Sequence, residues 1–400
     1  MTVAPSTARA PLGWWASTGW LAGGHVVTVV LRLIALVAVA RALGVDDVGL
    51  VVVGLSLGGA LAMTFSGTQT VGVIAASQHP DQVRSIRDAA VRQQLAIAAA
   101  GLTVVAMGLA VWQPRGSWVL FLFALSALTQ TVTLRWLLVA LGDARYAATV
   151  VAVGAGLFLI GCLVAVRGPD DLWRVAALHV GVEVVVAAVL WTRSTLLYQT
   201  DDATSADFSL RRSLVLSTLQ AARIAPLLLS VVVVSIVLSE SEAGRFSLLQ
   251  RAALAGFAVV ALHTEAGTAP LVGRAGSRER VGRATAPLVG ATLVVAGAAF
   301  VLADPVVDLV LNDETYRGLG GLAALFVLAL GAGLLSGPRQ QIGVADGREG
   351  WLLVASAGAA VGTIVLAASL LPSLGLIAVG WAELAGQAAF LAFTIRIRAR

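Results

Sequence analysis

The sequence predicts an all-α polytopic membrane protein with about twelve transmembrane helices, in two six-helix lobes around a central cavity. Of the 400 residues, 58% are hydrophobic and only 12% are charged, and the mean hydropathy is +0.90. Apolar stretches near the ~20 residues that cross a bilayer recur along the whole chain. This composition excludes a soluble globular fold.

Hydropathy predicts six spans in the first half of the chain, at 17–40, 48–76, 95–112, 118–141, 147–166 and 172–192. It predicts six more in the second half, at 214–238, 246–272, 284–302, 319–335, 351–371 and 376–395. The longest connection between spans is polar and falls at the midpoint of the chain. We therefore expect an N-terminal lobe at 1–192, a cytoplasmic linker at 193–212 and a C-terminal lobe at 213–400.

Arginines in the connections predict the orientation of the spans. The N-terminus, the even-numbered connections and the C-terminal tail hold 17 arginines, whereas the odd-numbered connections hold 6 when Arg174, at the start of the sixth span, is counted with them. By the positive-inside rule, we expect both termini in the cytoplasm and the protein in the plasma (inner) membrane. Asp170 and Asp313 would then face outward, and Ser277 and Arg400 would face the cytoplasm. Because these arginines are dispersed over short loops, we expect no nucleic-acid partner.

Four arginines lie within the predicted spans, and one of them, Arg135, lies near the inner end of its span, where its side chain can snorkel to the interface. The other three are candidates for a functional role, because a cation at the centre of a membrane helix costs roughly 2.5–3.5 kcal/mol. They are Arg32 in the first span, Arg223 in the seventh and Arg251 in the eighth. Two interpretations are open: the arginines line a cavity and bind an anionic cargo, or they pair with carboxylates. Guanidinium groups suit phosphate and carboxylate oxygens, which favours the first for Arg32 and Arg223.

Other polar residues share helix faces with these arginines. His25 and Thr28 lie on the face of the first span that carries Arg32, and Gln220 lies one turn before Arg223. The candidate substrate-binding residues are therefore Arg32, Arg223, Arg251, His25, Thr28 and Gln220. For each hydroxyl or amide, a hydrogen bond between packed helices is the alternative.

Two glutamates lie deep in predicted spans and 200 residues apart, Glu183 in the sixth and Glu383 in the twelfth. Arg32 and Arg223 are separated by a similar 191 residues, which indicates a weak internal repeat. Both carboxylates are candidates for ion coupling. Pairing with an arginine across the helix bundle is the alternative.

Small-residue motifs predict close helix packing at Gly54-x-x-x-Gly58 and Gly358-x-x-x-Gly362. The sequence contains no H-E-x-x-H, G-x-S-x-G or G-x-x-x-x-G-K motif and no paired metal-ligand cluster. The single cysteine, Cys162, allows no intrachain disulfide. We therefore expect no catalytic residue, no enzyme activity, no cofactor and no metal site.

Four segments carry a resemblance to a known family: ARALGVDDVGL at 40–50, SEAGRFSLLQRAAL at 241–254, VLNDETYRGLGGLAALFVLAL at 310–330 and VADGREG at 344–350. Together with the span layout, they resemble the polysaccharide transporters, which are the lipid-linked oligosaccharide (O-unit) flippases of the multidrug/oligosaccharidyl-lipid/polysaccharide exporter superfamily. The resemblance implies that the chain flips a polyprenyl-diphosphate-linked oligosaccharide across the membrane by alternating access, for cell-surface polysaccharide assembly. We expect a monomer, with a polysaccharide polymerase or glycosyltransferases as candidate partners.

Competing function classes make different demands on the sequence. A multidrug or small-solute antiporter of the same superfamily would share the architecture, but acids should dominate a cavity for organic cations. A major-facilitator carrier would show a G-x-x-x-D-R-x-G-R pattern after its second span, and residues 77–94 lack it. A multi-span polysaccharide polymerase or ligase would carry a large external loop, whereas the longest outer connection here spans only 303–318.

Overall fold

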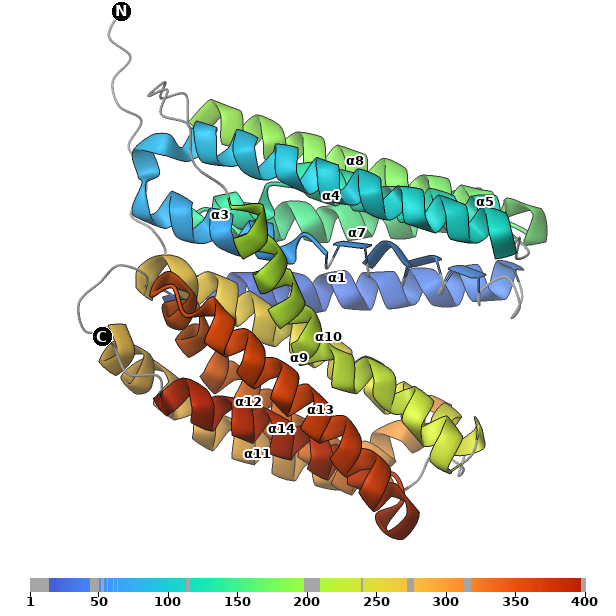
Figure 1. Cartoon of the computed structure of the whole chain (residues 1–400). Helices are drawn as coiled ribbons and strands as arrows, with labels where there is room; N and C mark the ends of the chain where they lie inside the picture. The colour runs from blue at the N-terminus through green and yellow to red at the C-terminus, as the bar shows by residue number, and fades with distance from the viewer. Residues whose placement is uncertain are drawn as a thin grey trace, which may run out of the picture. The chain divides into compact units, whose positions relative to one another are not determined.

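The computed structural model contains helices and turns, and no strand, in the part of the chain that it describes. It describes residues 14–43, 50–51, 54–55, 57–59, 61–62, 64–112, 116–197, 209–238, 240–271, 277–311 and 318–396. This confirms the predicted all-α class. The chain divides into two compact units, Met1–Ser217 and Thr218–Arg400 (Figure 1). The central cavity expected between the two halves stays a prediction.

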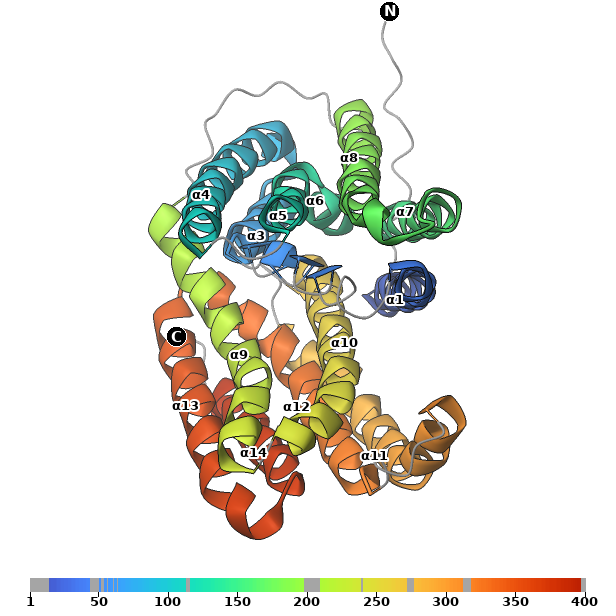
Figure 2. The same cartoon turned by 90° about the vertical axis from the view of Figure 1, so that its right-hand side faces the viewer.

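Unit 1 is built from helices that pack along their lengths. They are α1 (Trp14–Leu43), α3 (Ser66–Gln78), α4 (Val83–Trp112), α5 (Ser117–Val132), α6 (Arg135–Ala140), α7 (Ala144–Ala165), α8 (Leu172–Leu197) and the first turns of α9 (Leu210–Val237). Helix α1 packs along α7, and α5 packs against both α4 and α8 (Figure 2). Phe123 and Phe158 belong to the buried core where α1, α5, α7 and α8 meet.

Unit 2 contains the rest of α9 and five further helices. These are α10 (Glu240–Leu271), α11 (Ser277–Leu311), α12 (Gly320–Ala345), α13 (Glu349–Leu374) and α14 (Ile377–Arg396). Helix α12 occupies the centre of the unit, because α10, α11 and α14 all pack against it. The core is formed by residues such as Phe246 and Phe326, whose rings lie 6.1 Å apart.

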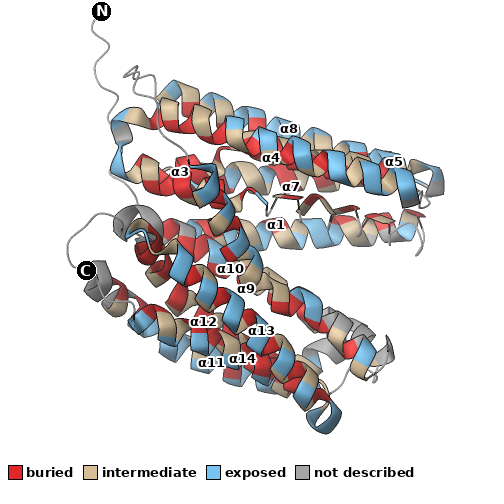
Figure 3. Ribbon diagram, in the orientation of Figure 1, coloured by how far each residue is buried: buried red, intermediate tan, exposed pale blue. Residues whose placement is uncertain are grey.

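The outer faces of both units are apolar, which is the reverse of a water-soluble protein. Exposed side chains include Val104 and Val111 on α4 and Val294 and Val301 on α11. Figure 3 shows exposed segments, in pale blue, recurring along the helices of both units. Ten helices in the described residues are long and apolar enough to cross a membrane. Because regular helices satisfy their own backbone hydrogen bonds, they can present such faces to hydrocarbon. The chain is a multi-pass membrane protein.

Three predicted spans differ from the helices that form. The span expected at 48–76 is interrupted, since the chain turns at Thr64 and Phe65 before α3 begins. The span expected at 118–141 remains one apolar stretch long enough to cross a membrane, Ser117–Ala140, but it is broken into α5 and α6 where Thr133 adopts an extended conformation. The span expected at 246–272 lies in α10, whose polar residues leave only Ala252–Thr264 as a shorter apolar stretch.

Glycines set the distance between several helices. At Gly54 and Gly58, a Cβ would overlap Phe123 and Ser126 of α5, so the close packing predicted for this motif is confirmed. Gly358 and Gly362 of α13 have no atom near a built Cβ, so the same prediction is wrong for the second motif. Small residues permit close approach, but only the fold decides whether a neighbour is there.

The closest packing in unit 1 joins α3 to the start of α9. The backbone N–H of Gly67 donates a hydrogen bond to Ser217 Oγ at 3.0 Å. A Cβ on Gly67 would overlap the backbone carbonyl of Ser213, and a helical backbone cannot move aside without losing hydrogen bonds. The absence of a side chain at Gly67 therefore permits the close contact of α3 with α9, and the hydrogen bond to Ser217 stabilises it.

We expect Gly67→Ala to lower the stability of the protein by ~1–3 kcal/mol, the usual cost of overpacking a close contact. Gly108→Ala on α4 is the matched control, because nothing lies within 4 Å of its built Cβ. There, the better helix propensity of alanine should leave stability equal or slightly higher. Thermal unfolding of the detergent-purified variants measures both effects. Equal melting temperatures for the two variants would contradict the packing argument.

Candidate functional site

An ion pair connects the first and last full helices of unit 1. Arg32 Nη2 of α1 lies 2.6 Å from Glu183 Oε1 of α8, within hydrogen-bond distance. The Glu183 side chain is only 12% exposed, whereas that of Arg32 is 43% exposed. The structure thus shows the carboxylate pairing that was one of the two interpretations of these residues. It also leaves much of the guanidinium uncovered, because Glu183 occupies only part of its donor edge.

A cavity of about 320 Å³ lies beside this ion pair. Its polar lining consists of Arg32, Ser126, Gln130 and His179, and the remaining lining residues are apolar. His179 is buried between the rings of Phe123 and Phe158, with centroids 5.7 and 5.8 Å away. No carboxylate is among the described residues that line this cavity. Its charged lining is therefore cationic, although the neighbouring Glu183 balances it.

The other predicted residues of α1 have more local roles. Thr28 is buried, and its hydroxyl donates a hydrogen bond to the carbonyl of Gly24 at 2.8 Å, within its own helix. His25 is half-buried, and its Nε2 atom has no hydrogen-bond partner among the described residues. Neither residue lines the cavity beside Arg32. Of the polar face predicted on the first span, the structure brings Arg32 alone to this cavity.

In unit 2, Arg223 of α9 is held by neutral partners. Its Nη1 donates to Gln340 Oε1 at 2.7 Å and its Nη2 to Ser336 Oγ at 3.3 Å, both on α12. Its guanidinium also lies over the ring of Phe390 on α14, 5.1 Å from the centroid. This combination of amide, hydroxyl and aromatic contacts holds a cation in an apolar bundle without a direct carboxylate bond.

Glu383 of α14 lies close to this arginine. It is buried and accepts a hydrogen bond from Gln387 Nε2 at 3.0 Å, one turn further along the helix. Glu383 and Arg223 line one small cavity of about 10 Å³, together with Ser356 and Thr363. That volume is close to the minimum that a single water molecule needs, and the unpaired Gln387 Oε1 supplies an acceptor there.

The two units therefore use the same plan. Each brings the arginine of its first helix, Arg32 or Arg223, near the glutamate of its last, Glu183 or Glu383. The spacing in the sequence indicated this repeat, and the contacts give it a physical basis. The arrangements differ in space, since the exposed Arg32 borders a cavity of about 320 Å³ and the half-buried Arg223 borders one of about 10 Å³.

The remaining predicted residues are not brought to these contacts. Gln220 is half-buried on α9 and does not line the cavity beside Arg223. Arg251 belongs to α10, and its side chain lies outside the described residues. The binding and coupling roles assigned to these side chains stay predictions, as does a cationic cavity shared by both halves.

The sequence interpretation missed the partners of Arg223. The tenth span was expected to end at Leu335, because hydropathy falls at the polar residues that follow. Helix α12 instead continues to Ala345, so Ser336 and Gln340 lie inside the helix bundle and are buried. Because Ser336 and Gln340 are four residues apart, they lie on the same face of a helix. A predicted span that continued past Leu335 would have shown this polar face.

Among the described residues, no group of three or more histidine, cysteine or acidic side chains could hold a metal ion. The described side chains of both sites offer hydrogen bonds and charge pairing. Such sites can bind an anion, exchange an ion pair or bind a proton.

The fold matches solved structures, although no protein-family model and no curated protein matches the sequence. An outward-facing multidrug resistance MATE family transporter of the MOP superfamily matches with a TM-score of 0.72 and 16% identity, over 97% of this chain and 95% of that chain. The Vibrio cholerae MATE transporter VcmN, as a single-site mutant, matches with a TM-score of 0.73 and 14% identity, over 96% and 94%.

A MOP superfamily transporter from Pyrococcus furiosus also matches, with a TM-score of 0.71 and 14% identity, over 98% of this chain and 97% of that chain. For that protein, a reverse polarity of the binding pocket and a different function are described. At these identities the likeness concerns the fold. The chain has the fold of MATE transporters of the MOP superfamily, nearly from end to end.

We expect Glu183→Gln to destabilise unit 1, because it leaves the Arg32 guanidinium without its anionic partner. Breaking a fully buried pair costs ~3–5 kcal/mol. Since 43% of the Arg32 side chain is exposed, we expect a smaller loss, on the order of 1–2 kcal/mol. A double-mutant cycle with Arg32→Gln, followed by thermal unfolding, measures the coupling between the two residues.

Arg174 and Asp171 provide the matched control pair. They lie 2.9 Å apart in the same unit, and the Arg174 side chain is also 43% exposed. Because they are neighbours at the start of one helix, their coupling should not exceed ~0.5 kcal/mol. A coupling between Arg32 and Glu183 no larger than that of the control pair would show that the long-range ion pair does not stabilise the unit.

Proposed function

We propose that this protein is a transporter that flips a polyprenyl-diphosphate-linked oligosaccharide across the plasma membrane by alternating access, for cell-surface polysaccharide assembly. The observation that carries the proposal is the Arg32 guanidinium, which borders the cavity of unit 1 and is 43% exposed. The likeness of the fold to MOP transporters supports the transport class. The four segments that resemble polysaccharide transporters support the cargo.

The chemistry of the cavity suits a phosphate group. Arg32 uses Nη2 for Glu183, so other guanidinium N–H groups remain for a ligand. Ser126, Gln130 and His179 add polar groups on the cavity wall. Charge-assisted hydrogen bonds from a guanidinium to phosphate are among the strongest that a protein makes. A cavity of about 320 Å³ holds the charged part of the cargo, while the polyprenyl chain stays in the bilayer.

Arg223 is the second candidate phosphate ligand. Its partners Gln340 and Ser336 are uncharged, so they can be exchanged for phosphate oxygens without leaving an unpaired charge behind. Arg251, His25, Thr28 and Gln220 remain candidate contacts for the sugars or the diphosphate. This assignment predicts that substitutions of Arg32 and Arg223 lower transport more than substitutions of the other candidates.

Competition between the cargo phosphate and Glu183 for Arg32 would couple cargo binding to proton uptake. A phosphate that binds the guanidinium displaces Glu183, and a carboxylate that loses its cation in an apolar site binds a proton. Cargo binding and proton uptake would thus be linked at one ion pair. Glu383 is the corresponding candidate in unit 2. Because the sequence shows no nucleotide-binding motif, an ion gradient or the membrane potential is the energy source that we propose.

The second candidate is a multidrug or small-solute antiporter, and the likeness of the fold to a multidrug resistance MATE family transporter favours it. A site for organic cations needs an accessible carboxylate. Here Glu183 is 12% exposed and already paired, and it does not line the cavity. The matching transporter with reversed pocket polarity illustrates how one fold serves pockets of different charge. We therefore rank anionic cargo first.

The arginine distribution supports an orientation with both termini in the cytoplasm. We propose that the protein acts as a monomer in the plasma membrane. A polysaccharide polymerase or glycosyltransferases would supply or consume its cargo.

We expect Arg32→Ala and Arg223→Ala each to lower transport roughly tenfold or more, because a hydrogen bond to a charged group contributes ~1.5–3 kcal/mol. Lysine at either position should restore part of the rate, since it keeps the charge but loses the planar fork. The measurement is transfer of a lipid-linked diphosphate oligosaccharide to the outer leaflet of proteoliposomes. Export at the wild-type rate by the double variant would overturn the cationic site.

Two controls separate a binding role from loss of structure. Arg174→Ala removes an arginine of equal exposure that is paired with Asp171, and it should leave transport unchanged. Arg32→Ala combined with Glu183→Ala removes both charges, so the protein should stay folded and still fail to transport. Accumulation of a cationic dye that depends on Glu183 would instead favour the antiporter.

We expect Glu183→Gln to remove the dependence of transport on an imposed pH gradient, because glutamine mimics the protonated carboxylate. Glu383→Gln tests the corresponding role in unit 2. Asp171→Asn is the control, since Asp171 also pairs with an arginine but lies outside the site. Transport in proteoliposomes with and without the gradient is the measurement. Undiminished gradient dependence in the variant that carries both glutamine substitutions would exclude these carboxylates from coupling.

A further inference from the structure

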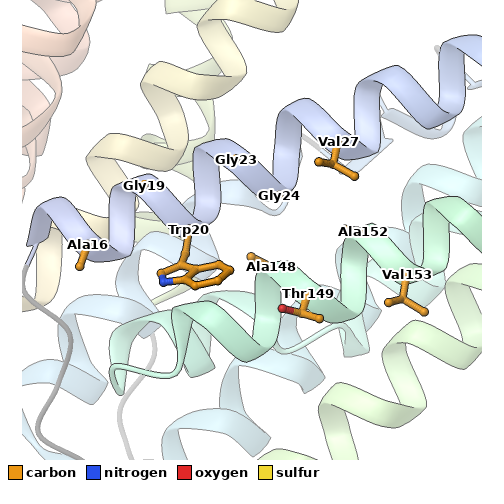
Figure 4. A pocket seen from close by; sticks show the side chains of 10 residues that line it. All are labelled: Ala16, Gly19, Trp20, Gly23, Gly24, Val27, Ala148, Thr149, Ala152 and Val153. Carbon is orange, nitrogen blue, oxygen red and sulfur yellow. The ribbon is translucent and has the colours of Figure 1, made fainter.

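An open groove of about 700 Å³ runs between α1 and α7 of unit 1, away from the ion pair. Apolar atoms dominate its surface, and Figure 4 shows the side chains that line it. The lining residues are Ala16, Gly19, Trp20, Gly23, Gly24, Val27, Ala148, Thr149, Ala152 and Val153. Its volume lies within the range of ~300–1,000 Å³ that is usual for small-molecule sites.

Glycines create the space in this groove. Gly24 touches α7, because a Cβ there would lie 2.9 Å from the Cβ of Ala148. Gly19 and Gly23 have no atom within 4 Å of a built Cβ, so they form an open wall. Gly24 contacts Ala148, and Leu31, further along α1, lies beside Gly156, further along α7, so the two helices run parallel. Both helices therefore begin at the same end of the groove.

That end carries an aromatic ring and a positive charge. Trp20 lies between the two helices near their first turns (Figure 4). The guanidinium of Arg145, in the first turn of α7, lies over this ring, 4.7 Å from its centroid. The Arg145 side chain is exposed and forms no ion pair with a carboxylate of the described residues. Tryptophan and arginine at the end of apolar helices are typical of the headgroup region of a bilayer.

We propose that this groove binds an anionic phospholipid, with one hydrocarbon chain between α1 and α7 and the phosphate on Arg145. The apolar walls fit the hydrocarbon chain, and the guanidinium complements the headgroup charge. The chain presents apolar helix faces to the membrane throughout, so phospholipid is always available to this groove.

The groove is separate from the site proposed for transported cargo. Arg32 lies twelve residues after Trp20, which places it about 18 Å further along α1 and roughly 120° around the helix. None of the residues that line the groove lines the cavity beside Arg32. A lipid held here would fix α1 against α7 and leave the cargo site open. The proposal concerns lipid binding and does not depend on which cargo is transported.

Native mass spectrometry of the detergent-purified protein, after incubation with phosphatidylglycerol or phosphatidylcholine, tests the proposal. We expect one retained phosphatidylglycerol per protein, preferred over phosphatidylcholine roughly fivefold, the effect of one basic residue near an anionic headgroup. Gly23→Leu fills the groove and should abolish retention of both lipids. Arg145→Gln should keep the groove but remove the preference for the anionic lipid.

Matched variants keep the test decisive. Gly108→Leu places the same side chain at another open, exposed helix position, and Arg174→Gln removes another exposed arginine of unit 1. Both should retain lipid as the wild type does. Ala152→Leu blocks the opposite wall and replaces Gly23→Leu if that variant does not fold. Equal retention of the two phospholipids by the wild type, or equal loss in Gly23→Leu and Gly108→Leu, would mean annular lipid only and would overturn the proposal. Displacement of phosphatidylglycerol by an equimolar polyprenyl diphosphate would assign the groove to the cargo and would also overturn it.

Discussion

A charged side chain inside a hydrocarbon layer must find a partner, and this constraint organises both units of the protein. Arg32 meets it with Glu183 across α1 and α8, at 2.6 Å. Arg223 meets it with the neutral groups of Gln340 and Ser336 and the ring of Phe390. In each case the partners come from distant helices, so the charge also specifies which helices lie together.

The two arginines differ in how much of the guanidinium group is accessible to a ligand. The guanidinium of Arg32 is partly uncovered beside an open cavity, and its single carboxylate partner can be exchanged for another anion. Arg223 is half-buried, and the cavity that it shares with Glu383 has space for about one water molecule. A site that can exchange partners suits cargo recognition. The smaller site around Arg223 has neutral partners, which can exchange hydrogen bonds without leaving a charge unpaired.

Small residues are a second feature that organises the helices. A glycine allows a close contact where another helix lies beside it, and leaves open space where none does. Gly67 allows α3 to meet the start of α9, and Gly24 allows α1 to touch α7. Trp20 and Gly24 both line the groove between these helices, and the Arg145 guanidinium lies over the Trp20 ring. The same helix pair thus combines a close contact with an open groove of about 700 Å³.

The sequence by itself determined the class of protein, because the composition and repeated apolar stretches can satisfy backbone hydrogen bonds only as membrane helices. It also identified Arg32, Arg223, Glu183 and Glu383 as candidate functional residues, because a charged residue within an apolar stretch can be recognised from the sequence alone. Hydropathy placed helix ends poorly where polar residues continue a helix, so Ser336 and Gln340 were missed as partners. It also could not separate the occupied small-residue motif at Gly54 from the empty one at Gly358.

Only the tertiary structure decided which arginine meets which acid, how much of each is exposed, and where helices separate into a cavity or groove. Those outcomes depend on contacts between residues more than a hundred positions apart, as for Arg32 with Glu183 and Arg223 with Gln340. Local sequence patterns indicate that a charge is placed where its burial is energetically unfavourable. The atoms that offset that cost are set by how the helices pack.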